Sequence, residues 1–191
     1  NSIPSHIILY MIITFYYNYS TMFICWASQA ALYYYYGIPK YILTKKIFGI
    51  FEYEVLEDSV LTRGFDDIFY FPQSRYAYTL EEDVRSIRDL RIIASREDTG
   101  VNLAISLDNR FVFVSGHGEY GRDTLYKEYL RDRSRGMNTK KPINYFKNGN
   151  EDEGILMRWR AHGDLLFTNW LNYCVYQETP YDITSIKEKE I

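Results

Sequence analysis

A strand followed at once by a helix is predicted between Thr21 and Gly37. Residues 21–24 form the short apolar run of a buried strand, and from Trp26 onward apolar residues recur at the i, i+3, i+4 spacing of one helix face. Gly37 is expected to end that helix. Cys25 lies at the junction, where a tight turn holds its side chain out of the sheet, beside the helix N-terminus and the Trp26 backbone N–H.

This setting favours a thiolate and a developing oxyanion, and it makes Cys25 a candidate nucleophile. The alternative is that Cys25 is a small buried hydrophobe, which is the usual fate of a free cysteine. The stretch alone favours neither alternative.

A second candidate site follows the apolar strand predicted at Phe111–Val114. His117 and Glu119 stand at i and i+2 between glycines, and in extended backbone both side chains point to the same side. A carboxylate in that place holds the tautomer of the imidazole and stabilises the imidazolium. A solvated turn is the alternative. We favour catalysis because His117 and Cys25 both follow short apolar strands, where open α/β sheets have their ligand crevice.

The composition argues against several function classes. Lys and Arg number 22 against 25 Asp and Glu, so the chain lacks the basic excess typical of nucleic-acid binding. Two cysteines, Cys25 and Cys174, show no metal or disulfide spacing, which favours no metal and a reducing, cytoplasmic setting. The apolar run at 7–17 is too short to span a bilayer and lacks the features of a secretory leader, so we expect a core strand or helix there and no membrane partner.

The remaining pattern is that of an α/β domain. Residues 101–114 predict a hairpin, and residues 123–135 predict a helix that ends at Gly136. Residues 72–75 follow a short apolar run and begin with Pro72, so we expect a loop there.

A series of short motifs runs in order, without large gaps, over about residues 20–182. They are ICW-x-x-QAALYYYYGIPKY (24–41), GFDD (64–67), SR (74–75), GH-x-EY (116–120), TL-x-x-EYLRD (124–132), NYF (144–146), W-R-x-H (159–162) and NWLNY-x-VYQETPYD (169–182). Together they resemble the homoserine O-acyltransferases (acetyl or succinyl) of methionine biosynthesis, which belong to the class I glutamine-amidotransferase-like group. The resemblance implies a flavodoxin-like α/β sheet flanked by helices.

The resemblance also implies roles for the two candidate sites. Cys25 takes the acyl group from acyl-CoA as a thioester, and His117 and Glu119 are base and orienter. A thioester keeps most of the activation of the acyl group, and general-base help from His117 to the homoserine hydroxyl is worth about 10²–10⁴-fold. The Trp26 backbone N–H is our candidate oxyanion donor.

Three further residues match the substrate-contacting positions of the family. These are Lys46, Ser74 and Arg131, and we expect Arg131 to bind the homoserine carboxylate with two parallel hydrogen bonds. The expected activity is therefore ping-pong transfer by an acyl-CoA:L-homoserine O-acyltransferase, with acetyl favoured over succinyl. Acetyl-CoA or succinyl-CoA is a co-substrate and no bound cofactor is expected. The partners are small molecules, and a homodimer stays open.

The chain departs from the family pattern at several positions. Ala27-Ser28 replaces the usual Gly-Ala, Gly118 and Gly121 replace Pro and Asp around the histidine, and Gln73 stands where a His is common.

Residues 1–20 match poorly, 21–182 form the expected catalytic domain, and 183–191 form a charged tail. Since family members carry a long segment ahead of the ICW strand, we expect an N-terminally truncated copy that lacks the N-terminal part of the sheet. Two alternatives stay open: another Cys-His-Glu enzyme of this fold, either a glutamine amidotransferase or a hydrolase, and an inactive remnant or binding module.

Overall fold

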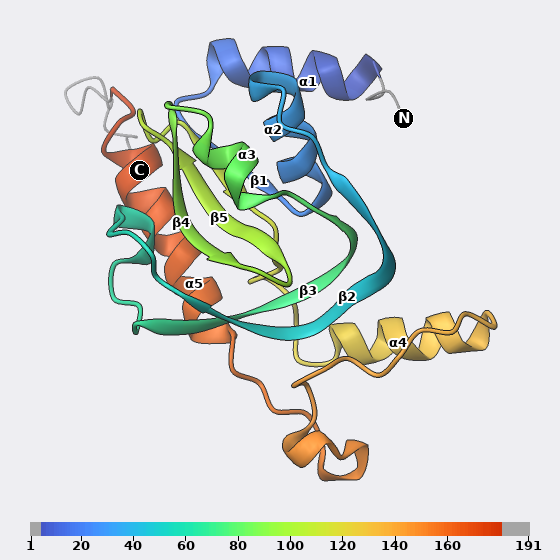
Figure 1. Ribbon diagram of the computed structural model, residues 1–191. Coiled ribbons are helices and arrows are strands. Elements are labelled where there is room, and N and C mark those ends of the chain that lie inside the picture. The colour runs from blue at the N-terminus through green and yellow to red at the C-terminus, as the bar shows by residue number, and fades with distance from the viewer. Residues whose placement is uncertain (1–4, 181–191) are drawn as a thin grey trace, which may run out of the picture.

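A four-stranded sheet carries the two strands that lead to the candidate catalytic residues. The computed structural model describes residues 5–180, so the predicted tail lies outside the described residues (Figure 1). The strands are β1 (Thr21–Ile24), β4 (Leu90–Arg96), β5 (Gly100–Ser106) and β6 (Phe111–Val114), in the spatial order β1-β6-β5-β4. β1 and β6 are parallel and in register from Thr21↔Phe111 to Ile24↔Val114. The residues that follow them therefore leave the sheet at the same edge.

Both faces of this sheet are covered, as the hydrophobicity of its strands requires. Helices α1 (Ser5–Tyr17), α2 (Trp26–Tyr36) and the short α3 (Glu81–Arg85) pack on one face, where the core includes Phe23, Leu32 and Phe113. The other face packs against α5 (Arg160–Asn169), the π-helical turn η4 (Trp170–Tyr176) and a second sheet. Helices on both sides of a central sheet confirm the predicted flavodoxin-like α/β class (Figure 1).

The second sheet consists of two long antiparallel strands, β2 (Tyr41–Glu54) and β3 (Ile68–Tyr78). Helix α4 (Thr124–Ser134) follows the histidine loop, and its buried residues share a core cluster with β2, in which Phe48, Leu125 and Trp159 are prominent. Short 3-10 turns complete the chain: η1 (Val60–Thr62), η2 (Lys147–Gly149) and η3 (Glu151–Glu153).

The loop predicted at residues 72–75 is wrong, because these residues lie inside β3. Pro72 pairs with Ile50, whose N–H donates to Ile143 and so points away from β3. Ile50 and Pro72 are therefore a non-hydrogen-bonded pair of the antiparallel ladder, in which the backbone N–H of each residue points away from the partner strand. The missing N–H of Pro72 thus costs no ladder hydrogen bond. Its carbonyl accepts from the His117 N–H at 2.9 Å.

Other elements follow the sequence closely. β5 and β6 form the predicted hairpin, and Asn109 in its turn has a positive φ of 58°. The apolar run at 7–17 is a helix, but only part of it is core: Met11 and Thr14 are buried, while Tyr10 and Tyr16 are more than 70% exposed. Among residues 5–180, no helix has the length and apolar character needed to cross a bilayer.

Candidate active site

Cys25 occupies a strained turn between β1 and α2. Its φ of 54° and ψ of −114° are unusual for a residue with a side chain, and such conformations cost on the order of 1–3 kcal/mol. The turn is held by a hydrogen bond of 2.7 Å from the Cys25 N–H to the Val114 carbonyl of β6. The side chain is half-buried, and the helix begins at the next residue, Trp26. This is the geometry of a nucleophile presented at a strand-to-helix turn.

The Trp26 N–H belongs to the first turn of α2, where backbone N–H groups have no partner within the helix. It directly follows the candidate nucleophile along the chain. The structure therefore places the predicted oxyanion donor beside Cys25, at the positive end of the helix dipole.

His117 lies on the loop after β6, next to both other members of the predicted triad. Its Nδ1 is 2.6 Å from Glu119 Oε1, and the Cys25 side chain lies near enough to the ring to act on the pKa of His117. Burial lowers the pKa of His117, but the contacts with Cys25 and Glu119 outweigh burial and raise that pKa to about 9. An imidazolium facing the sulfur is thus favoured at neutral pH. The ring also stacks on Tyr120, with centroids 4.1 Å apart.

The other free cysteine has a different environment. Cys174 is 1% exposed, and burial, together with the charge of Glu178, raises the pKa of its thiol to about 11. A buried thiol of this kind is unreactive. The two cysteines of the chain are therefore a matched pair for a test of reactivity.

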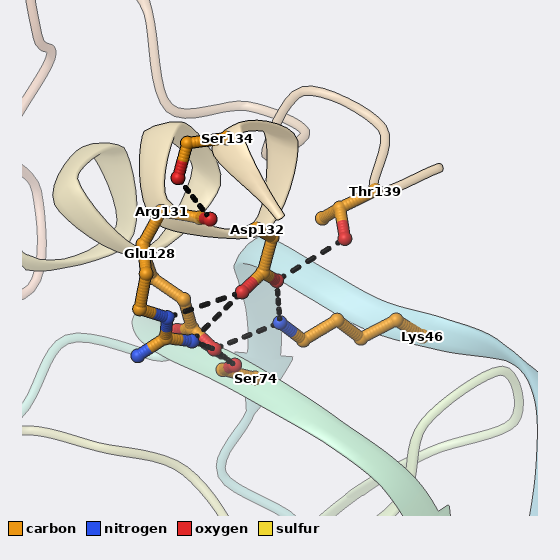
Figure 2. A network of polar contacts seen from close by, with 7 residues as sticks. All are labelled: Lys46, Ser74, Glu128, Arg131, Asp132, Ser134 and Thr139. Carbon is orange, nitrogen blue, oxygen red and sulfur yellow. Dashed lines mark hydrogen bonds and ion pairs between the residues drawn. The ribbon is translucent and has the colours of Figure 1, made fainter. Parts of the chain in front are cut away.

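The three predicted substrate contacts gather in one polar network between β2, β3 and α4 (Figure 2). Lys46 Nζ lies 2.8 Å from Glu128 Oε1 and 3.1 Å from Asp132 Oδ2. Ser74 donates to the Glu128 carboxylate at 2.9 Å. Arg131 Nη2 lies 2.9 Å from Asp132 Oδ1 and 3.3 Å from Glu128 Oε1. We call these five residues, together with Thr139, the polar cluster.

Sequence reasoning missed the two carboxylates of the polar cluster. Asp132 is 3% exposed and also accepts from Thr139 at 3.1 Å. Burial acts to raise its pKa, but hydrogen bonds from Arg131 and Lys46 outweigh it, and the pKa lies below its ordinary value. The available signal was the spacing of Glu128 and Asp132, one helical turn apart on either side of Arg131, which puts both on one face of α4.

Tyr120 connects the polar cluster to the cysteine and histidine. Besides stacking on His117, it lies within electrostatic reach of Glu128 and of Cys25. Burial is the main cause that raises the pKa of Tyr120, and electrostatic interactions with Glu128 and Cys25 add to it. Cys25 and the polar cluster thus both act on one tyrosine.

A buried polar scaffold lies beneath the site and was also missed. Arg75 is 6% exposed and donates to Gln73 at 2.8 Å and to the Thr99 carbonyl at 2.6 Å. Burial lowers the pKa of this guanidinium, while the charges of Tyr53 and Cys25 act to raise it. Gln73 donates to Tyr53 and Asn102. A hydrophobicity pattern cannot reveal such a scaffold, because it depends on contacts between distant strands.

Known proteins match most of the chain. A family model described as homoserine O-succinyltransferase matches residues 9–181. A homoserine O-acetyltransferase of Bacillus cereus (strain B4264) is 54% identical over 163 residues, which cover 85% of this chain and 54% of the relative. A homoserine O-acetyltransferase of Bacillus mycoides (strain KBAB4) is 53% identical over 163 residues, which again cover 85% of this chain and 54% of the relative. The chain spans about half the length of the curated relatives it matches.

Solved structures agree on the fold. A glutamine amido transferase from Methylobacillus flagellatus superposes with a TM-score of 0.63 at 8% identity, over 90% of this chain and 71% of the other. A glutamine amidotransferase from Thermotoga maritima gives a TM-score of 0.54 at 16% identity, over 88% and 65%. At such low identity, these likenesses show the fold alone.

Proposed function

Since the chain belongs to the homoserine O-succinyltransferase family, we propose that it carries the acyl-transfer site of an acyl-CoA:L-homoserine O-acyltransferase. The observation that supports this most directly is the grouping of Cys25, His117 and Glu119: Glu119 holds the His117 ring at 2.6 Å, and Cys25 acts on the pKa of the same ring. It supplies a nucleophile, a base and an orienting carboxylate in one place.

In the first half-reaction the acyl group moves to the enzyme. The Cys25 thiolate attacks the thioester carbonyl of acyl-CoA, and the Trp26 N–H stabilises the oxyanion of the tetrahedral intermediate. The bond between the carbonyl carbon and the CoA sulfur then breaks. The leaving thiolate takes the proton of the His117 imidazolium, which leaves the ring neutral.

In the second half-reaction the neutral ring acts as a base. His117 takes the proton of the homoserine hydroxyl as its oxygen attacks the Cys25 thioester. The carbon–sulfur bond breaks, and the thiolate returns opposite a newly formed imidazolium. Glu119 holds the ring in one tautomer during both steps. The enzyme has then returned to its starting state, and the product is an O-acyl homoserine.

The polar cluster suits the amino-acid substrate. Homoserine is a zwitterion, and Lys46 and Arg131 offer cations to its carboxylate, while Glu128 offers an anion to its ammonium. We propose acetyl as the acyl group. Curated relatives at 54% identity carry the acetyltransferase name, which supports this choice over succinyl.

The proposal can be tested by labelling. The chain is incubated with radiolabelled acetyl-CoA, succinyl-CoA or glutamine, and quenched peptides are mapped by mass spectrometry. We expect an acetyl group on Cys25 that homoserine then removes. Cys174→Ser is the matched control and should keep the label. Glutaminase activity without acyl label would support an amidotransferase instead, and absence of both would support a non-catalytic chain.

A further inference from the structure

The N-terminal part of β2 is displaced from its ladder. Between the pairs Ile42↔Ala77 and Ile47↔Arg75, four residues of β2 lie opposite one residue of β3, Tyr76. A bulge redirects the side chains that it contains, and bulges are common next to active sites. Here the displaced residues, 43–46, include two lysines.

The bulge forms one wall of a surface pocket of about 440 Å³. Residues 138–141, which follow α4, also line it. Tyr76, which is 44% exposed, and Phe48 add aromatic surface. This volume lies within the range of small-molecule and cofactor sites, about 300–1,000 Å³.

The lining of the pocket is positively charged. Lys45, Lys46, Lys140 and Lys141 contribute to it, and no acidic residue does. Lys46 is paired within the polar cluster, and Lys141 Nζ lies 3.0 Å from Glu151. Within residues 5–180 no ion pair involves Lys45 or Lys140. Two positive charges are thus available to a ligand, together with polar groups of Thr44 and Asn138.

The pocket adjoins the proposed substrate site. Lys46 and Thr139 line the pocket, and both are also members of the polar cluster that Figure 2 shows. A ligand group held here would lie beside bound homoserine. Acyl-CoA has a phosphate-rich nucleotide at the far end of a long, flexible arm, so its nucleotide can bind at a distance from its thioester.

We propose that this pocket binds the 3′-phosphorylated adenosine diphosphate end of the acyl-CoA co-substrate. Lys45 and Lys140 contact its phosphates as point charges, and Tyr76 stacks on the adenine. The proposal rests on the acyl transfer proposed above and adds to it a site for the donor nucleotide. Binding energy from this remote group positions the thioester for Cys25.

The test uses adenosine 3′,5′-bisphosphate as a probe, titrated into the 191-residue chain by calorimetry. The double variant Lys45→Ala/Lys140→Ala should raise the Kd about tenfold, since it removes two charged contacts. Tyr76→Ala should raise it about fivefold or more through lost stacking. The control Lys127→Ala/Lys147→Ala removes the same charge from exposed positions outside the pocket lining and should leave the Kd within about twofold.

Kinetics with two donors provide a second readout. The double variant should raise the KM for acetyl-CoA about tenfold and leave that for S-acetyl-N-acetylcysteamine, which has no nucleotide, unchanged. A Kd that does not change in the double variant, an equal effect of the control, or equally tight binding of inorganic phosphate would each overturn the proposal.

The two proposals can fail separately. If acetyl transfer proceeds from both donors but the lysine changes affect neither, the pocket assignment is wrong and the transfer stands. If neither donor acylates Cys25, the transfer fails, and the bisphosphate titration still decides whether the pocket binds a nucleotide.

Discussion

Glu119 Oε1 lies 2.6 Å from His117 Nδ1, and this contact determines which ring nitrogen is available for chemistry. Because the carboxylate accepts the Nδ1 proton, Nε2 remains for Cys25 and for substrate. The same contact stabilises the imidazolium. The proton on His117 is therefore bound more tightly in the folded chain than in the unfolded chain, with consequences for both stability and reactivity.

We expect the free energy of unfolding to depend on pH through His117. Its folded pKa of about 9 lies above the ordinary value of 6.5, so the folded state retains this proton over a wider pH range. The stabilisation is complete below 6.5 and is lost as the pH rises through about 9. Urea unfolding of the wild type and of His117→Ala at several pH values measures it. The difference between the two free energies should shrink across that interval.

Glu119→Gln supplies the control for this prediction. It removes one of the two partners that raise the His117 pKa, so the stabilisation should disappear at a lower pH than in the wild type. A free-energy difference that stays constant across the whole interval would show that the imidazole is not held as described.

A second prediction concerns the two thiols. Iodoacetamide at neutral pH should alkylate Cys25 at least about tenfold faster than Cys174, because Cys25 is half-buried beside His117, whereas the thiol of Cys174 is buried with a pKa of about 11. Mass spectrometry of the two peptides over time gives both rates. His117→Ala should slow Cys25 and leave Cys174 unchanged. Equal rates for the two thiols would argue against activation of Cys25.

A third prediction concerns Asp132, which contacts both cations of the polar cluster. Asp132→Asn keeps the shape but weakens the hold on Lys46 and Arg131, so the KM for homoserine should rise about tenfold. The turnover number should change little, since Asp132 does not contact the reacting atoms. The control Asp123→Asn alters an exposed acid of the same helical region, which pairs with Lys127. A fall in turnover with unchanged KM would contradict the role of Asp132 in positioning these cations.

The sequence predicts the parts of this molecule that depend on local pattern. The junction at Cys25 follows from an apolar run, a cysteine and a helical period within 17 residues, from Thr21 to Gly37. The position of His117 follows from the apolar strand just before it. Parallel pairing of those two strands then brings the side chains together, and a strand-end argument anticipates this result.

Features that depend on contacts between distant segments escape such reasoning. Pro72 predicts a loop by local rules, and only its pairing with Ile50 makes a strand possible there. Arg75 gives no sign that it is buried, because its partners come from β3 itself and from Thr99, before β5. Asp132 appears as one more charged residue of an exposed helix until Lys46 of β2 is placed against it.

A fourth prediction concerns the close approach of α5 to the histidine loop. A Cβ at Gly163 would clash with the Gly118 carbonyl oxygen, and Gly118 directly follows His117. The atoms concerned are backbone, so they cannot turn away as a flexible side chain can. Gly163→Ala must therefore displace the helix or the loop that carries the imidazole, at a cost of about 1–3 kcal/mol in stability. If the loop moves, His117 shifts relative to Cys25.

The matched control is Gly121→Ala in the same loop, where a Cβ would meet only ordinary contacts, the nearest being Thr124 Oγ1 at 3.5 Å. Thermal unfolding and the iodoacetamide rate of Cys25 distinguish the two variants. Gly163→Ala should lower both the Tm and the rate, whereas Gly121→Ala should leave both near wild type. A lower Tm with an unchanged rate would mean that α5 moves and the imidazole stays. The close contact would then serve stability and would not set the position of His117.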